Sequence, residues 1–209
     1  MARGSNGERK PGRPEGSSPI GEKSNKNKIY QLKIFLRDSE PEIWRRVLVS
    51  GGGVTLKKLH RVIQEAMGWT DSHLHEFIVG KIIYSEPDPE MERGHSKNEN
   101  RFHLYEIAPK ARMSFMYVYD FGDGWEHTIK VEKIADADAR YPGYPLCLEG
   151  EKASPPEDCG GIYGYYGMME VRNDPKHPEY EDVMEWLGEE FDPDVFDLEE
   201  TNEILKQIR

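Results

Sequence analysis

Cysteine is scarce in this chain, because the 209 residues include only Cys147 and Cys159. Two cysteines are too few for a disulfide scaffold, and they favour a reducing compartment. Long apolar runs are also lacking: no stretch approaches the ~20 residues of a membrane-spanning helix, and the first residues contain no apolar core of a signal peptide. These absences predict a cytoplasmic protein without a membrane partner.

Negative charge dominates the chain, but it is distributed unevenly. The formal net charge is −11, whereas residues 1–28 hold seven basic and three acidic side chains, a net +4 that leaves −15 for the rest. Because an acidic surface repels phosphates, we expect contact with nucleic acid only through this basic tail. The tail is rich in Gly, Ser, Pro and Asn, so we expect it to be disordered. A solubilising extension is the simpler interpretation of such a tail.

Residues 29–209 carry the periodicities of one folded domain. Alternation of apolar and polar residues predicts strands at 29–37, 43–49, 113–121 and 125–134. The stretch 74–84 is apolar on both faces, which predicts one continuous central strand. Residues 86–100 and 141–161 are expected to be irregular.

Helical spacing of apolar residues begins after Thr55 and ends at Gly68, which predicts one early helix. Three short helices are predicted near residues 162–171, 179–187 and 198–208. Strands early and helices late are typical of an α+β fold. The predicted domain is therefore a small mixed or antiparallel sheet with one N-terminal helix and a C-terminal group of short helices.

Residues 117–127 form a predicted hairpin, with the sequence YDFGDGWEH around its turn. Asp120, Asp123 and His127 lie within this short stretch, and two carboxylates with an imidazole can hold a divalent metal or perform acid–base catalysis. Simpler interpretations exist for each residue. An Asp before Gly accepts backbone amides in ordinary turns. His127 shares the inward face with Ile129 and Val131, as a hydrogen-bonded core histidine would.

A second set of candidate ligands lies in WTDSHLHEF, residues 69–77. In a strand, His73 and His75 would project from the same face, and such pairs are common metal ligands. Asp123 or His127 would supply a further ligand if the two strands are neighbours. The predicted site is therefore a divalent metal held by His73, His75, Asp123 and His127. Alternatively, the two histidines only cap and orient the start of the strand.

The stretch SPPEDCGGIYGYYG, residues 154–167, combines a stiff Pro-Pro pair with two acids and a Gly-rich helix start. Exposed amides at a helix start can bind anions, but Glu157 and Asp158 would repel a phosphate. The same acids should raise the pKa of the Cys159 thiol, which argues against a nucleophilic thiolate. A rigid loop packed across the sheet is the simplest interpretation. Asp120, Trp125, Glu157 and Asp158 are the remaining candidates for residues that line a pocket.

Taken in order, the segments EIWRRVLV, TLKKLHRVIQEAMGW, DSHLHEF, YDFGDGWEH, PPEDCGG and FDPDVFDLEETNEIL resemble the plasmid pRiA4b ORF-3-like family over nearly all of residues 29–209. Some members of that family carry a resolvase-like label as passengers of insertion elements. The resemblance implies a small α+β domain and assigns no biochemical activity. The family commonly has a cysteine just before the Pro-Pro pair, where this chain has Ser154, so a cysteine-rich metal site is not expected. Nothing in the sequence resembles a serine or tyrosine recombinase core.

Three functions follow from these observations. The first is a non-enzymatic binding module with a protein partner, because no complete catalytic constellation is evident. The resemblance implies a link of such a module to mobile elements. The second is a metal-dependent hydrolase or nuclease that uses the predicted metal ligands. The third is DNA binding through the basic tail.

Overall fold

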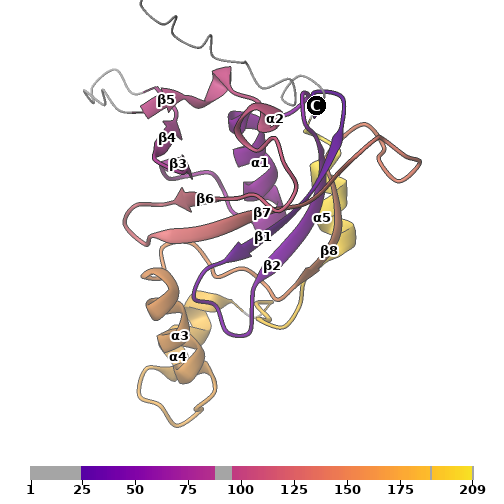
Figure 1. The fold of residues 1–209 in the computed structure, drawn as a ribbon. Helices are drawn as coiled ribbons and strands as arrows, with labels where there is room; N and C mark the ends of the chain where they lie inside the picture. Colours follow the sequence, from indigo (N-terminus) through magenta and orange to yellow (C-terminus); the bar gives the residue numbers. More distant parts are fainter. Residues whose placement is uncertain (1–24, 88–95, 189, 209) are drawn as a thin grey trace, which may run out of the picture.

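The computed structural model describes residues 25–87, 96–188 and 190–208. The tail predicted to be disordered spans residues 1–28, and its residues 1–24 lie outside the described part of the chain. Within the described chain, eight strands form one mixed sheet in the order β5-β4-β3-β6-β7-β1-β2-β8 (Figure 1). β4 and β5 run parallel, and the other neighbours are antiparallel. The strands are β1 (Ile29–Leu36), β2 (Trp44–Ser50), β3 (His75–Val79), β4 (Ile82–Ser85), β5 (Ser96–Asn98), β6 (Ser114–Tyr119), β7 (Trp125–Ala135) and β8 (Leu146–Glu151).

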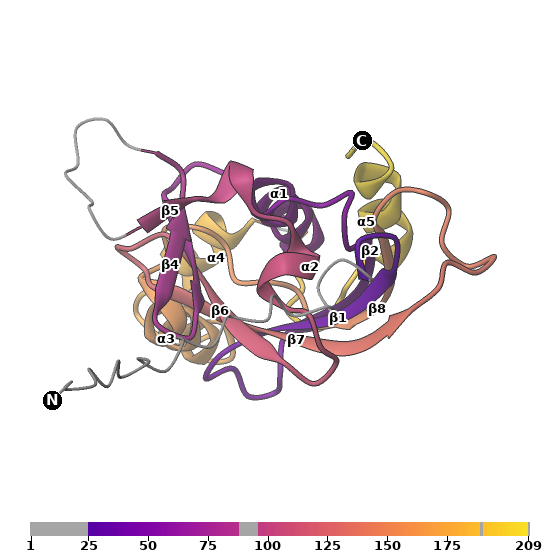
Figure 2. The same ribbon diagram turned by 45° about the horizontal axis from the view of Figure 1, so that its top comes forward.

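The helices divide into two groups. They are α1 (Leu56–Met67), the 3-10 turn η2 (Glu99–Arg101), α2 (Leu104–Ile107), α3 (Gly161–Arg172), α4 (Tyr180–Leu187) and α5 (Leu198–Leu205). The sheet curves around α1 and α2, and α5 lies beside α1 at the β8 edge (Figure 2). α3 and α4 pack against each other at one end of the molecule (Figure 1). None of the described helices combines the length and apolar character that crossing a bilayer requires.

The core lies between α1 and the concave face of the sheet. The inward residues of β1, including Leu32 and Ile34, are fully buried, as are Leu59 and Ile63 on α1. α1 begins where the Thr55 hydroxyl accepts the Lys58 amide at 3.2 Å. It ends at Gly68, whose left-handed backbone (φ 76°) suits a residue without a Cβ. The predicted limits of this helix are confirmed.

The secondary-structure predictions for three stretches of the chain are wrong. Residues 74–84 are two strands, β3 and β4, because Gly80 turns the chain with φ 61°. The stretch 141–161 contains β8, which pairs with β2, and 86–100 ends in β5 and η2. These strands have weak local signals, and pairing with a neighbour decides their structure. The predicted helix arrangement is only partly right, since α2 lies mid-chain and α5 packs with α1 away from α3 and α4.

A buried arginine ties the early and late parts of the chain together. Arg45 on β2 is 2% exposed, and its guanidinium donates to the carbonyl oxygens of Ala66 (2.8 Å) and Glu151 (3.0 Å). It also donates to the Ser154 hydroxyl at 3.2 Å and lies 3.9 Å from the centre of the Phe196 ring. Burial lowers the pKa of Arg45 to about 10, so the group stays charged at neutral pH. Arg45 therefore joins the end of α1 to β8 and the Pro-Pro loop.

Replacing this side chain should unfold the protein more easily. Arg45→Met leaves several buried carbonyl oxygens without donors, and we expect the free energy of unfolding to fall by about 2–4 kcal/mol in urea denaturation. Arg37→Met is the matched control, because Arg37 pairs with Glu126 at the exposed surface. That change should cost less than about 1 kcal/mol. Equal losses for the two variants would contradict the role assigned to Arg45.

Candidate metal centre

A polar cleft of about 320 Å³ lies between α1, the segment that leads into β3, and β4. Its lining includes His60, Asp71, His73, His75 and Ser85. Imidazoles and carboxylates are the side chains that bind transition metals and transfer protons at neutral pH. This cleft is therefore the place where the chain concentrates its candidate chemistry.

Two histidines from different elements stack inside the cleft. His60 lies on α1, and His75 is the first residue of β3. Their ring centroids are 3.5 Å apart, with an angle of 2° between the ring planes. Both side chains are buried, with exposed fractions of 2% for His60 and 8% for His75. Two imidazolium ions would repel each other at this distance, which disfavours a positive charge on His60.

A closed chain of hydrogen bonds holds His60. Its Nε2 lies 2.7 Å from Asp71 Oδ1, and its Nδ1 lies 2.8 Å from the Tyr117 hydroxyl. Gln64, one turn after His60 on α1, donates to the Tyr117 oxygen at 2.9 Å and accepts the Asp71 amide at 3.0 Å. Burial raises the pKa of Tyr117 well above its usual value, so the phenol keeps its proton. Tyr117 therefore donates to Nδ1, and the Nε2–H of His60 points at Asp71.

The electrostatics keep His60 neutral. Burial, followed by the neighbouring His75, lowers its pKa to about 4 despite the nearby Asp71. At neutral pH the ring is therefore uncharged, which is the form that binds metals.

A buried carboxylate holds the second histidine. Glu99 on η2 is 0% exposed, and its Oε2 lies 2.8 Å from His75 Nε2. The other oxygen, Oε1, is buried and has no hydrogen-bond partner among the described residues. Most buried polar groups in folded proteins have a hydrogen-bond partner, so Glu99 keeps one oxygen available for a further contact.

Three candidate ligand atoms lie close together in the cleft. One ring nitrogen from each of His60 and His75 and one Asp71 oxygen all lie within 4.8 Å of one another. Two imidazoles and a carboxylate are the donor set of many catalytic zinc sites and of non-haem iron sites. The side chain of Asp71 is 52% exposed, so the set opens to the cleft. The residues present therefore fit a divalent transition metal.

The predicted pairing of His73 with His75 is wrong. β3 begins at His75, so His73 precedes the strand, and although both histidines line the cleft their ligand atoms belong to different clusters. His73 instead lies beside the hairpin, where its Nε2 is 3.7 Å from Asp120 Oδ2 and 3.2 Å from Asp158 Oδ1. These three residues form a second cluster whose ligand atoms lie within 4.8 Å of one another.

Asp123 and His127 belong to neither cluster among the described residues. Asp123 Oδ2 accepts the Gly160 amide at 3.1 Å, which docks the hairpin on the loop before α3. His127 is fully buried on the inward face, as its alternation predicts, and its Nδ1 lies 3.1 Å from the Trp125 carbonyl oxygen. The four predicted ligands therefore do not converge on a common point.

Two other predicted pocket residues position the cleft without lining it. Glu157 accepts the amide (3.0 Å) and hydroxyl (2.6 Å) of Thr70 and the hydroxyl of Tyr119. These bonds hold the Pro-Pro loop against the segment that leads into β3. Trp125 is 1% exposed, and its ring packs 5.8 Å from that of Trp69 in the core.

Sequence reasoning missed His60, Asp71 and Glu99. His60 carried a usable signal, because a histidine on the apolar face of α1, between Leu59 and Ile63, must be satisfied inside the core. Asp71 lies between α1 and β3, and its backbone adopts a left-handed conformation with φ 57°. Glu99 lies within the stretch 86–100 predicted to be irregular, and no local pattern marks it as buried.

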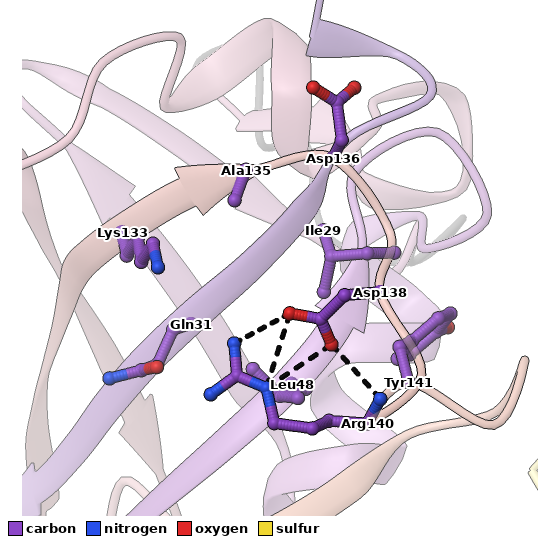
Figure 3. Close-up of a pocket in the computed structure, with 9 residues that line it drawn as sticks. All are labelled: Ile29, Gln31, Leu48, Lys133, Ala135, Asp136, Asp138, Arg140 and Tyr141. Carbon is purple, nitrogen blue, oxygen red and sulfur yellow. Dashed lines mark hydrogen bonds and ion pairs between the residues drawn. The ribbon is translucent and has the colours of Figure 1, made fainter.

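A further cleft, at the far end of β1, does not offer a comparable site. It encloses about 20 Å³, room for about one water molecule. Figure 3 shows that Asp138 and Arg140 in its wall point at each other, and they pair at 2.7 Å. Its polar groups are thus already used locally.

The fold and these motifs define a small α+β protein with a histidine-lined cleft. The profile of the family described as "Plasmid pRiA4b ORF-3-like protein" matches residues 28–200, so the chain belongs to this family. The chain is 39% identical over 160 residues to "Uncharacterized protein y4hQ" of Sinorhizobium fredii (strain NBRC 101917 / NGR234), covering 77% of this chain and 81% of that protein. The crystal structure of "Protein of Unknown Function MM3350" from Methanosarcina mazei Go1 is similar, with a TM-score of 0.73 and 35% identity. That match covers 82% of this chain and 96% of the other.

The buried His127 makes a prediction about pH. Burial lowers its pKa to about 4, whereas an unfolded chain binds the proton near 6.5. Above pH 6.5, His127 is neutral in both the folded and the unfolded state and does not reduce the free energy of unfolding. As the pH drops from 6.5 toward 4, the unfolded chain binds the proton first, so the free energy of unfolding falls. In His127→Gln, the difference in unfolding free energy between pH 7.5 and pH 4.5 should shrink by about 2–3 kcal/mol. Urea denaturation at the two pH values measures it.

His177→Gln serves as the control, because His177 lies in the loop between α3 and α4 and is only partly buried. The pH dependence of the unfolding free energy of this variant should match that of the unmodified protein. An unchanged pH dependence in His127→Gln would mean that His127 is not held neutral by the core.

Proposed function

We propose that this protein binds a divalent first-row transition metal through His60, Asp71 and His75 and hydrolyses a substrate held in the adjoining cleft. The observation that carries the proposal is the parallel stack of two buried imidazoles, whose nitrogens lie within 4.8 Å of an exposed carboxylate. Three protein ligands leave a coordination position for water, as in catalytic zinc sites.

Each of the two histidines has a supporting partner, as metal-binding histidines commonly do. Tyr117 and Gln64 orient His60, and the buried Glu99 orients His75. Coordination through Nε2 requires the tautomer of His60 in which the proton is on Nδ1. In that tautomer the Nδ1–H donates a hydrogen bond to the Tyr117 oxygen. Metal binding therefore changes the tautomer of His60, and this step releases no net proton.

The cleft also offers groups for a substrate. The Ser85 hydroxyl is buried without a hydrogen-bond partner among the described residues, and Ser85 lines the cleft. Lys57 and Arg61 of α1 lie on the same wall. When bound, the metal would lower the pKa of a coordinated water toward neutrality and so supply a hydroxide nucleophile. The residues of the chain orient that water and the substrate around it.

Removing one ligand should weaken metal binding strongly. The full-length chain, stripped with chelator and dialysed at pH 7.5, is titrated with Zn²⁺, Mn²⁺ and Fe²⁺ by calorimetry, the last without oxygen. His60→Ala and Asp71→Asn should each abolish one equivalent of bound metal. Tyr117→Phe should weaken that equivalent about 10–100-fold, because the orientation of His60 is lost.

His177→Ala is the control for loss of a histidine outside the cleft and should bind metal as the unmodified chain does. The metal-loaded protein should hydrolyse members of a panel of esters, amides and phosphate esters, and chelator should abolish the activity. Metal binding that is unchanged in both His60→Ala and Asp71→Asn would refute the assignment of this site.

A binding module for a protein partner is the second candidate function, and the α3–α4 pair supports it. α4 buries none of its residues, Tyr163 on α3 is 87% exposed and Trp186 on α4 is 47% exposed. Exposed aromatic residues are enriched where proteins bind partners. Beside α3 lies a cleft of about 230 Å³ lined by Tyr165 and Arg172. The Nε of Arg172 is buried and has no partner among the described residues, so an acidic side chain of a partner would be bound there.

Changing this surface should separate binding from the metal site. The double variant Tyr163→Ser/Trp186→Ser should recover at least tenfold less of a partner captured by the unmodified chain. Ile82→Ser, an exposed apolar residue on β4, is the matched control and should retain the partner. Equal recovery by the double variant, or no specific partner for the unmodified chain, would contradict this candidate function.

A further inference from the structure

The cluster of His73, Asp120 and Asp158 joins three segments that are distant in sequence. His73 precedes β3, Asp120 begins the turn between β6 and β7, and Asp158 follows the Pro-Pro pair. Backbone bonds fix two of these segments to each other, because the Asp120 amide donates to the Leu74 carbonyl oxygen at 2.9 Å. The position of His73 relative to the hairpin is thus set by the sheet.

The imidazole of His73 faces two carboxylates without a properly aligned hydrogen bond. Its Nε2 lies 3.2 Å from Asp158 Oδ1 and 3.7 Å from Asp120 Oδ2. The nitrogen is nevertheless buried, and it makes no hydrogen bond to any described residue. A histidine that served only as an ion-pair partner would aim an N–H at one oxygen. Here the nitrogen lies near one oxygen of each carboxylate.

Asp120 is prepared to bind a cation. Its side chain is 9% exposed, and Oδ1 accepts the Gly122 amide at 2.9 Å, which leaves Oδ2 toward His73. Among the described residues, no lysine or arginine forms an ion pair with Asp120 or Asp158. A buried carboxylate of this kind needs a positive charge beside it.

We propose that His73, Asp120 and Asp158 form a second site for a divalent cation, separate from the one at His60, Asp71 and His75. One imidazole nitrogen and two carboxylate oxygens suit Mn²⁺ or Zn²⁺. Asp158 is 73% exposed, so the bound cation keeps positions open to solvent. The two sites share no ligand, and the second therefore does not depend on the first.

The second site has two consequences. A cation there ties the segment before β3, the hairpin and the Pro-Pro loop together, so its binding stabilises the folded state. Because His73 also lines the 320 Å³ cleft, the cation lies at the border of the space proposed for the substrate.

The test is a metal titration of the full-length, chelator-stripped chain with Mn²⁺ and, separately, Zn²⁺, followed by calorimetry and by the melting temperature. The unmodified chain should bind two equivalents. Asp158→Asn should lose one equivalent or bind it at least tenfold more weakly, and most of the metal-induced rise in melting temperature should be lost. His73→Gln should behave in the same way. Asp138→Asn, in an exposed loop, is the matched control and should keep both equivalents.

The two proposed sites fail separately in this experiment. If His60→Ala changes nothing while Asp158→Asn loses one equivalent, the second site stands and the first falls. If Asp158→Asn and His73→Gln both bind metal with the stoichiometry and affinity of the unmodified chain, the second site is refuted. The double variant His60→Ala/Asp158→Asn should bind neither equivalent, and any tight binding that survives in it would overturn the assignment of these ligands.

Discussion

The hydroxyl of Tyr117 is the group on which the candidate site depends. Tyr117 lies in the middle of β6 and is fully buried, so its O–H must find partners inside the protein. α1 supplies them through His60 and Gln64, which lie one turn apart. The same Gln64 accepts the Asp71 amide and so places the turn after α1. A single buried phenol thereby links the packing of helix on sheet to the placement of two candidate metal ligands.

Burial also determines the chemistry of these groups. Desolvation lowers the pKa of His60 and His127 and raises that of Tyr117, so all three are neutral at physiological pH. Neutral imidazoles can stack and bind metals, whereas charged ones would repel each other and any cation. The Cys159 thiol follows the same rule, since burial and then Asp123 raise its pKa to about 12. The thiol therefore keeps its proton at neutral pH, and the raised pKa agrees with the expectation from the neighbouring acids in the sequence.

The strong local patterns of the sequence correspond to the elements that the structure contains. The hairpin of β6 and β7 and the helix from Leu56 to Met67 follow from alternation, turn residues and caps. β5 and β8 do not, because their local patterns are weak and each lies at an edge of the sheet. Their conformation comes from pairing with β4 and β2, and a local pattern contains no information about such neighbours.

The candidate site divides in the same way. The sequence by itself determined that the histidines at the start of β3 and the acids of the hairpin and the Pro-Pro loop are chemically notable, because polar groups beside apolar strands need partners. Only the tertiary structure decided which of them meet. A strand that starts at His75 instead of His73 sends the two histidines to different clusters, and burial of α1 brings His60 beside His75. Convergence depends on where strands start and which faces pack, and both are properties of the folded chain.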